Sequence, residues 1–235
     1  MESIGNLESN QKKEYVQNKI QGNLNWVNTL TKKVDEGITT RENANKMIAN
    51  VITAMEVKKE LAEDKARRDA LTGLYNKGAF NSEYQKAIES GTSFALIMID
   101  IDHFGKVNKA FGHDTGDNVL VQTALNFSSN LRQLRERDKN DFIARWGGEE
   151  FAIILMDVFR EEDLELVSEK LRKAVCERPF SVKVGEEIID IPITISIGAG
   201  IYKNGDKDLF FHKVDKDALL LAKETGRNKT VITSK

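Results

Sequence analysis

The sequence predicts an α+β or α/β domain of about 165 residues behind a helical N-terminal segment, and three observations lead to this prediction. Two continuously apolar runs, 94–99 and 151–156, have the length of buried strands. Residues 161–176 carry apolar side chains at helical spacing, so strands and helices are expected to share one sheet-based domain. Residues 1–68 lack proline and have helical periodicity, which separates them from residues 69–235.

The N-terminal segment is predicted to form two amphipathic helices. Gly37 interrupts a first apolar stripe, and Thr39, three residues before Glu42, offers a capping box for a second helix. The first stripe consists of Val16, Ile20, Leu24, Val27, Leu30 (or Thr31), Val34 and Ile38, and the second of Ala44, Met47 or Ile48, Val51, Met55 and Ala62. The two helices can fold back as a hairpin.

A single helical hairpin buries little apolar surface, so its stripe needs a further partner. We favour pairing with a second copy of the chain, as in coiled-coil or four-helix-bundle dimers. The alternative is that the stripe docks on the C-terminal domain of its own chain.

The remaining elements of the C-terminal region follow from the same patterns. A turn is expected at 145–148, flanked by strand-like sequence. Further helices are expected at 117–134 and 215–225, and further strands at 188–193, 194–201 and 230–232.

The composition argues against several functional classes. The net charge of −2 does not fit a general nucleic-acid binder, which is normally basic. The single cysteine, Cys176, excludes an intramolecular disulfide framework and fits a reducing compartment. The N-terminus lacks a signal-peptide core, and the run 94–99 is far shorter than the roughly 20 residues of a membrane span. We therefore expect a cytoplasmic protein without membrane insertion.

Two aspartates follow directly on the first apolar run. Asp100 and Asp102 stand two positions apart, so both side chains can face one site at the end of the strand. Mg2+ takes oxygen ligands, often one or two carboxylates together with substrate phosphates. The alternative is that these aspartates cap a following helix.

A second acidic pair, Glu149 and Glu150, precedes the second apolar run. Gly147 and Gly148 allow a tight turn with positive φ, which puts the glutamates at the tip of a hairpin. Hairpin tips are often acidic for solubility, so this pair alone is ambiguous. If the two apolar strands are neighbours, however, the four carboxylates meet, and a cation would relieve their repulsion.

Five motifs in collinear order resemble those of the GGDEF family of diguanylate cyclases. Residues 145–151, RWGGEEF, are similar to the family signature in its GGEEF form. The others are 69–76 (DALTGLYN), 100–104 (DIDHF) with Asn108, 111–117 (FGHDTGD) and 222–228 (AKETGRN). The resemblance covers residues 69–232, and the helical N-terminal segment falls outside it.

The resemblance implies a fold and a reaction. The fold is a central, mainly antiparallel sheet flanked by helices, like the palm of nucleotidyl cyclases and polymerases. The reaction condenses two GTP into cyclic di-GMP and two pyrophosphates with two Mg2+ ions per active site, for which Mn2+ can substitute.

The resemblance also implies roles for individual residues, in four groups. The metal ligands would be Asp100, the Ile101 carbonyl and Glu149, with Glu150 beside them as a further catalytic residue. The guanine would be bound by Asn108 and Asp117, the triphosphate by Lys223 and Arg227, and the phosphates also by backbone amides from His103 to Lys106, Phe104 included.

Each domain would bind one GTP, so the reaction implies an antiparallel homodimer in which each domain attacks the nucleotide of its partner. The N-terminal helices would raise the effective concentration of one domain near the other, and they are also a candidate docking site for a regulatory partner. The Asp117 carboxylate accepts from N1–H and N2–H2 of guanine but mismatches adenine, which argues for GTP; a helix N-cap role for Asp117 is compatible with this.

Three positions depart from the family pattern. Gly105 stands where the family usually has a lysine near the phosphates, and Leu220 replaces a usual tyrosine. Asp138 replaces the arginine of the R-x-x-D product-inhibition site, so its charge has the wrong sign for an anionic dinucleotide. We therefore expect little or no product inhibition through that site.

Three alternatives stay open at this point. The domain could bind GTP without turnover, because Gly105 replaces the usual lysine of the family. It could make a hybrid cyclic GMP-AMP, against which Asp117 argues. The N-terminal hairpin could also be a partner-binding adaptor whose output is the cyclase domain, which is compatible with the main prediction.

Overall fold

The computed structural model describes residues 22, 25–134, 141–156, 158, 160–203 and 209–233, with the backbone alone at 132–134. The chain forms two compact units, the N-terminal unit Met1–Lys65 and the C-terminal unit Ala66–Lys235. Among the described residues, no helix combines the length and the apolar character needed to cross a membrane.

The N-terminal unit contains a helix over residues 25–35 and the long helix α2 (Arg41–Ala66). The expected cap is one residue off: Thr40, rather than Thr39, precedes α2, and its Oγ1 accepts a hydrogen bond from the Asn43 amide at 3.2 Å. Leu30 and Ala44 are buried, which agrees with the predicted stripes. The stripe positions Val16, Ile20 and Leu24 lie outside the described residues.

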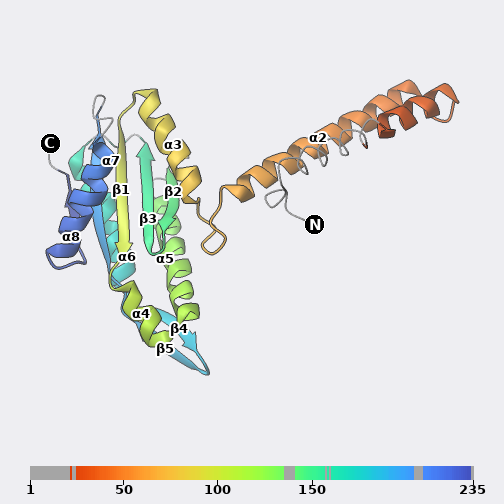
Figure 1. Ribbon diagram of the computed structural model, residues 1–235. Helices are drawn as coiled ribbons and strands as arrows, with labels where there is room; N and C mark the ends of the chain where they lie inside the picture. Colours follow the sequence, from red (N-terminus) through yellow and green to blue (C-terminus); the bar gives the residue numbers. More distant parts are fainter. Residues whose placement is uncertain are drawn as a thin grey trace, which may run out of the picture. The chain divides into compact units, whose positions relative to one another are not determined.

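The C-terminal unit alternates helices with strands (Figure 1). Its helices are α3 (Lys77–Ser90), α4 (Phe104–Phe111), α5 (His113–Leu134), α6 (Glu161–Cys176), α7 (Phe210–His212), the π-helix η2 (Lys213–Leu219) and α8 (Leu220–Glu224). Its strands are β1 (Phe94–Ile101), β2 (Phe142–Gly147), β3 (Glu150–Met156), β4 (Phe180–Val184), β5 (Glu187–Ile191), β6 (Ile195–Tyr202) and β7 (Thr230–Ile232).

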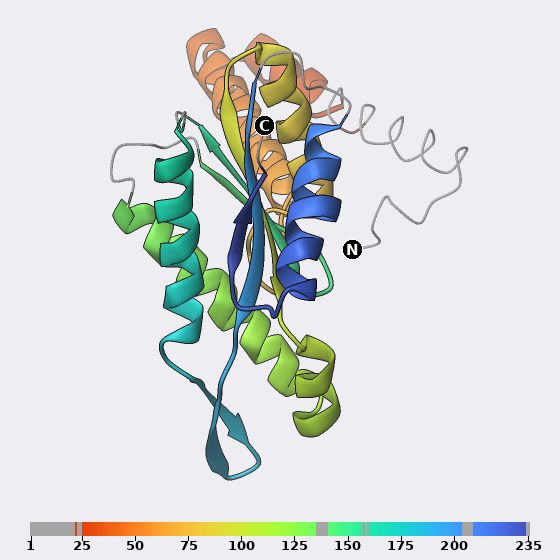
Figure 2. The same cartoon turned by 90° about the vertical axis from the view of Figure 1, so that its left-hand side faces the viewer.

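Five of these strands form one sheet in the order β2-β3-β1-β6-β7, and β4 pairs with β5 in a separate hairpin. All pairs in the main sheet are antiparallel except β6–β7. Helices α5 and α6 cover one face, while α3 and the α7–η2–α8 segment cover the other (Figure 2). The predicted α+β class, with a mainly antiparallel sheet flanked by helices, is confirmed.

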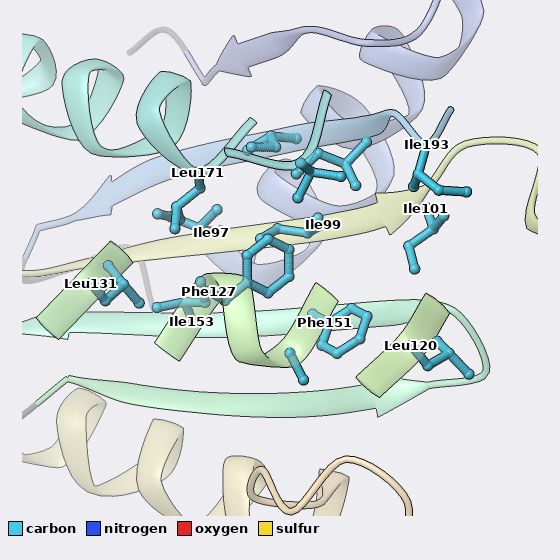
Figure 3. Close-up of a cluster of buried hydrophobic side chains, with 14 of the residues drawn as sticks. Ile97, Ile99, Ile101, Leu120, Phe127, Leu131, Phe151, Ile153, Leu171 and Ile193 are labelled. Carbon is cyan, nitrogen blue, oxygen red and sulfur yellow. The ribbon is translucent and has the colours of Figure 1, made fainter. Parts of the chain in front are cut away.

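The central strand β1 explains why the sheet is covered on both faces. Every residue from Phe94 to Ile99 is completely inaccessible to solvent, as expected for a strand that packs on both sides. Odd-numbered side chains of β1 point to the α5–α6 side, where Ile97, Ile99 and Ile101 pack with Phe127 and Phe151 (Figure 3). Even-numbered side chains point to the α3–η2 side.

The π-helix η2 lies unusually close to the sheet because β6 presents glycines to it. A Cβ atom on Gly198 would come within 2.4 Å of both the Val214 carbonyl oxygen and the Leu219 amide nitrogen. These two atoms are five residues apart, the spacing of a π-helical hydrogen bond. Because the glycines of β6 have no side chain, the backbone of η2 packs directly against the sheet.

Several predicted boundaries move in the structure. The predicted helix 161–176 is confirmed as α6, and the predicted strand 230–232 as β7. The helix expected at 117–134 begins four residues earlier, at His113, and the helix expected at 215–225 is π-helical in its first part. Helices α3 and α4 and strand β4 were not predicted.

Candidate active site

The residues singled out by the sequence gather at one end of the main sheet. β1 ends at Ile101, the β2–β3 turn carries Gly148 and Glu149, and α4 begins at Phe104. The turn that follows α8 lies at the same end, because Asn228 contacts the residue that follows β1, Asp102. Four chain segments thus bring their polar side chains together.

Asp100 and Glu150 lie side by side. They are directly opposite in the antiparallel β1–β3 pair, an arrangement that puts Cβ atoms roughly 5 Å apart. Asp100 continues the row of Leu96 and Met98, so it faces the side covered by η2 and α8. The predicted neighbourhood of the two apolar strands is therefore correct.

Glu149 belongs to the turn between β2 and β3. Its carbonyl oxygen accepts a hydrogen bond from the Ile101 amide at 3.3 Å, which ties the turn to the end of β1. The expectation that Gly147 and Gly148 adopt positive φ is wrong, since neither has such a backbone conformation. The turn lies at residues 148–149, between the paired Gly147 and Glu150, and a bulge between Arg145 and Gly147 precedes it.

Arg145 stabilises this turn through hydrogen bonds and an ion pair. Its guanidinium donates to the Gly148 carbonyl oxygen at 3.0 Å from Nε and 2.7 Å from Nη2, and Nη1 lies 3.2 Å from the Asp69 carboxylate. Asp69 also accepts from the backbone amide and the hydroxyl of Thr72. Burial works to raise the pKa of Asp69, but the Thr72 hydrogen bonds and the charge of Arg145 outweigh it and lower the pKa. The opening motif thus supports the signature turn.

Asp100 is paired with a cation of the closing motif. Lys223 Nζ lies 2.7 Å from Asp100 Oδ2, and the two side chains are 26% and 13% exposed. Burial raises the pKa of Asp100; Lys223 opposes this, while the charges of Glu149 and Asp102 add to it. The residue expected at the triphosphate therefore lies against the residue expected at the metal.

Asp102 has a role that the sequence did not predict. It is 5% exposed, and its carboxylate accepts hydrogen bonds from Ser196 Oγ at 2.6 Å, Thr194 Oγ1 at 2.7 Å and the Asn228 amide at 3.0 Å. These partners occupy both oxygens, so Asp102 does not join Asp100 in facing the site. It fastens the C-terminal turn to the sheet instead.

The turn after α8 has an uncommon backbone. Gly226, Arg227 and Asn228 all have positive φ, at 117°, 61° and 44°, a conformation that costs free energy for residues with side chains. Asp102 holds the Asn228 amide, and Arg172 of α6 donates to the Asn228 side-chain oxygen at 2.7 Å. These contacts fix the turn and leave the Arg227 side chain exposed.

Asn108 and Asp117 come from the facing helices α4 and α5. The Asn108 side-chain oxygen is buried and has no hydrogen-bond partner among the described residues. It lies over Gly116, where a Cβ atom would be 1.8 Å away, so glycine is required beside it. Asp117 is exposed and lies inside α5, which begins at His113. The expectation that Asp117 is also a helix N-cap is therefore wrong.

The start of α4 holds the other candidate phosphate contacts. The Phe104 side chain is buried, so this residue has its backbone amide to offer. The Lys106 side chain is exposed, but its amide already donates to the His103 carbonyl at 2.8 Å. Gly105 has open space where a side chain would begin, so the missing lysine is not explained by crowding.

Lys216 of η2 is a site residue that the sequence analysis missed. Its Nζ lies 3.0 Å from the buried Asp215 carboxylate. Hydrogen bonding to Asp215 and the charge of Asp215, with a smaller contribution from Glu150, raise the pKa of Lys216. Lys216 precedes Lys223 by seven residues, or two helical turns, and this spacing is the sequence signal that could have placed Lys216 on the same helix face as Lys223.

Comparison with known proteins decides the family. The family model described as "Diguanylate cyclase, GGDEF domain" matches residues 66–229. The chain belongs to this family. The resemblance found in the motifs is thereby confirmed.

Relatives of known name cover the same region. The response regulator PleD of Caulobacter vibrioides is 35% identical over 167 residues, which are 69% of this chain and 35% of PleD. The diguanylate cyclase DosC of Escherichia coli is 31% identical over 188 residues, 77% of this chain and 38% of DosC. The chain thus spans little more than a third of the length of these relatives.

Solved structures of GGDEF proteins share the fold. The coiled coil and GGDEF domain of DgcB from Caulobacter crescentus, in complex with c-di-GMP, matches with a TM-score of 0.68 and 28% identity over 83% of this chain and 100% of that one. The diguanylate cyclase SiaD of Pseudomonas aeruginosa, in complex with its activator SiaC, matches with a TM-score of 0.64 and 29% identity over 94% of this chain and 83% of SiaD.

GGDEF cyclases use divalent metal, and the donor set of this chain fits such an ion. The Asp100, Glu149 and Glu150 carboxylates and the Ile101 carbonyl are hard oxygen donors at one end of the sheet. Within the described residues, however, no three Asp, Glu, His or Cys side chains are gathered as a ready-made metal site. The arrangement fits an ion that takes few protein ligands and completes its shell with substrate phosphates.

Proposed function

We propose that this protein is a diguanylate cyclase, which condenses two GTP into cyclic di-GMP and two pyrophosphates. One observation carries the proposal: Glu150 of the family signature lies opposite Asp100 at the end of β1, and Asp100 is paired with the Lys223 cation. The combination of carboxylates for a metal with a cation for phosphates suits phosphoryl transfer.

The carboxylate side of the site would hold the metal. Asp100, the Ile101 carbonyl and Glu149 are its ligands in this proposal, and Glu150 lies next to them as a further catalytic residue. Two Mg2+ ions per site, replaceable by Mn2+, would neutralise charge on the attacked phosphate and activate the attacking hydroxyl. The Ile101–Glu149 backbone hydrogen bond supports this assignment, because it keeps both segments in register.

The cation side would hold the triphosphate. Lys223 and Arg227 are its side-chain contacts, and the backbone at Phe104 adds an amide donor at the start of α4. The Lys106 amide is already bonded to His103, so Lys106 would contribute its exposed side chain. The Asp102 anchor supports this assignment, since it holds the turn that carries Arg227. The open space at Gly105 leaves the phosphate region with one cation fewer than the family usually supplies.

Asn108 and Asp117 would bind the guanine. The buried and unpartnered Asn108 oxygen supports this, because an unsatisfied buried acceptor costs about 1–3 kcal/mol and a guanine N–H would satisfy it. The exposed Asp117 carboxylate accepts from N1–H and N2–H2 of guanine, which adenine cannot match.

The chemistry is two identical steps. In each, the 3′-oxygen of one GTP bonds to the α-phosphorus of the other, the bond from that phosphorus to the β-phosphate oxygen breaks, and pyrophosphate leaves as the hydroxyl proton is released. The residues of one site hold one nucleotide, so two domains in antiparallel arrangement are required and the active form is a homodimer.

The N-terminal unit would supply the dimer contact. Its exposed Met47, Val51 and Met55 support this, as does the coiled coil in the DgcB structure. SiaD was solved with its activator SiaC, so a regulatory partner at these helices is also proposed. We further propose a cytoplasmic location and little product inhibition; Asp138, on which the latter rests, lies outside the described residues.

The test is product analysis with matched variants. Purified protein is incubated with Mg2+ and GTP, with and without ATP, and products are identified by mass. We expect cyclic di-GMP and pyrophosphate, no hybrid product, and loss of at least about 100-fold in rate for Glu149→Ala. Glu89→Ala, an exposed glutamate of α3, is the control and should keep the wild-type rate.

The outcomes separate the competing functions. If a dimer that binds GTP makes no product, the cyclase proposal is overturned and the protein is a GTP-binding module. This alternative is favoured by Gly105, which replaces the usual lysine of the family. A cyclic GMP-AMP product in the presence of ATP would overturn the guanine selectivity assigned to Asp117.

A further inference from the structure

The contact between Lys223 and Asp100 joins two residues with different duties in the proposed mechanism. Lys223 Nζ is 2.7 Å from Asp100 Oδ2, the distance of a direct charge-assisted hydrogen bond. Asp100 is assigned to the metal and Lys223 to the triphosphate. A lysine ammonium and a divalent cation repel each other, so joint occupation of Asp100 by both is unfavourable.

The surroundings of Asp100 explain why it takes Lys223 as a partner. Asp100 is 13% exposed, lies opposite Glu150, and is within electrostatic reach of Glu149 and Asp102. A half-enclosed carboxylate among other carboxylates is unfavourable without a counter-charge. Lys223, whose ammonium contacts the Asp100 carboxylate directly, neutralises this charge from within the protein.

Lys223 is suited to leave this position. It lies one residue before the end of α8, and its side chain is 26% exposed. Lysine carries a compact charge on a flexible four-carbon stem, so the ammonium group can be redirected without moving the backbone. The turn behind it stays fixed, because Asp102 and Arg172 both hold Asn228.

Resting on the proposed function, we propose that Lys223 is an exchangeable counter-cation. It neutralises Asp100 in the nucleotide-free protein, and it moves to the triphosphate when a metal–nucleotide complex occupies Asp100. In this exchange the metal ion replaces Lys223 beside Asp100, and the displaced lysine binds the arriving triphosphate. Free metal must compete with Lys223 and binds weakly, whereas metal with nucleotide gives the lysine a new partner, so the two bind cooperatively.

Arg227 differs in the respect that matters. It is assigned to the same triphosphate, but it is exposed, and within the described part of the chain it has no carboxylate at ion-pair distance. Removing Arg227 should weaken nucleotide binding without releasing Asp100. It is therefore the matched control for Lys223.

The test measures Mn2+ binding without nucleotide, by electron paramagnetic resonance of the free ion. In Lys223→Met we expect Mn2+ alone to bind about 10-fold more tightly than in the wild type, while a non-hydrolysable GTP analogue with Mn2+ binds more weakly. Arg227→Met should weaken binding of the analogue and leave the affinity for Mn2+ alone unchanged. Asp100→Asn added to Lys223→Met should abolish the gain, which assigns it to Asp100.

The controls keep the outcome decisive. Lys223→Arg retains the charge and should keep Mn2+ binding weak, and circular dichroism verifies that each variant is folded. Unchanged or weaker Mn2+ binding in folded Lys223→Met would overturn the exchange. A gain in Mn2+ affinity in a protein that makes no cyclic dinucleotide would leave the exchange standing and remove the cyclase proposal, so the two failures are distinguishable.

Discussion

The two units of this chain bury their apolar residues in different ways. In the C-terminal unit the central strand β1 is inaccessible from Phe94 to Ile99, and apolar clusters cover both faces of the sheet. Among the described residues of the N-terminal unit, Leu30 and Ala44 are the buried hydrophobic side chains, while Met47, Val51 and Met55 are 39–50% exposed. The C-terminal unit can stabilise itself, whereas the N-terminal unit needs a partner to cover its exposed apolar side chains.

This difference has a functional consequence under the proposed mechanism. Substitutions in the C-terminal unit should change what each dimer does: its stability, its affinity for GTP or its rate. Substitutions on the exposed stripe of α2 should change how many dimers exist at a given protein concentration. The following predictions test this separation, from the largest expected effect to the smallest.

The largest effect is expected from charging the stripe. Val51→Glu with Met55→Glu should lower the specific activity about 1,000-fold at low protein concentration, because the tethering gain is lost, and the activity should recover as the concentration rises. Thr53→Glu, on the opposite side of α2, is the control. Activity measured across a dilution series, with sedimentation of the same samples, checks this. A loss that is equal at all concentrations would contradict the separation of the two units.

A smaller effect is expected where η2 meets the sheet. Gly198→Ala puts a methyl group within 2.4 Å of the backbone at Val214 and Leu219, and the free energy of unfolding should fall by about 3 kcal/mol. Gly105→Ala, which has open space around its Cβ, should not destabilise the protein. Urea denaturation measures both variants, and equal midpoints would show that η2 can shift away without cost.

The third prediction concerns the guanine site. Gly116→Ala would bring its Cβ within 1.8 Å of the Asn108 oxygen and 3.1 Å of the Phe104 ring, so Asn108 must move. We expect KM for GTP to rise about 10-fold through a misplaced hydrogen bond, with a smaller change in kcat. Steady-state kinetics test this, and Asn108→Ala combined with Gly116→Ala should add little to either single change. Additive losses in KM would mean that Gly116 acts through other contacts.

The smallest effect is expected at Asp69, and it depends on pH. Thr72 and Arg145 lower the pKa of Asp69 below its usual value despite burial, so the ionised form stabilises the folded state. This stability is present above the unfolded-state pKa of about 3.9 and is lost as the pH falls through the lower folded-state pKa. Asp69→Asn should cost about 1 kcal/mol at pH 7 and little at pH 2. Denaturation curves at both pH values test this; a cost that does not shrink in acid would refute the charge argument.

The local part of the fold was predictable because it depends on neighbours in sequence. The apolar runs that became β1 and β3, and the periodicity that became α6, record burial directly in the spacing of side chains. The acidic pairs were also visible, and the neighbouring strands bring Asp100 beside Glu150 as expected. The cap was placed at Thr39 instead of Thr40, since two adjacent threonines satisfy the same local pattern. The hairpin turn between β2 and β3 was predicted, but the positive φ expected of its glycines was not found.

The sequence by itself determined the α+β class, the main strands and the family motifs of this protein. The tertiary structure alone decided that Asp102 anchors Asn228, 126 residues away, and that Lys223 pairs with Asp100. It also decided that η2 becomes a π-helix against the glycines of β6. The physical reason is that burial periodicity is written in consecutive residues, whereas the partner of a hydrogen bond or a charge is set by which distant segments the fold brings together.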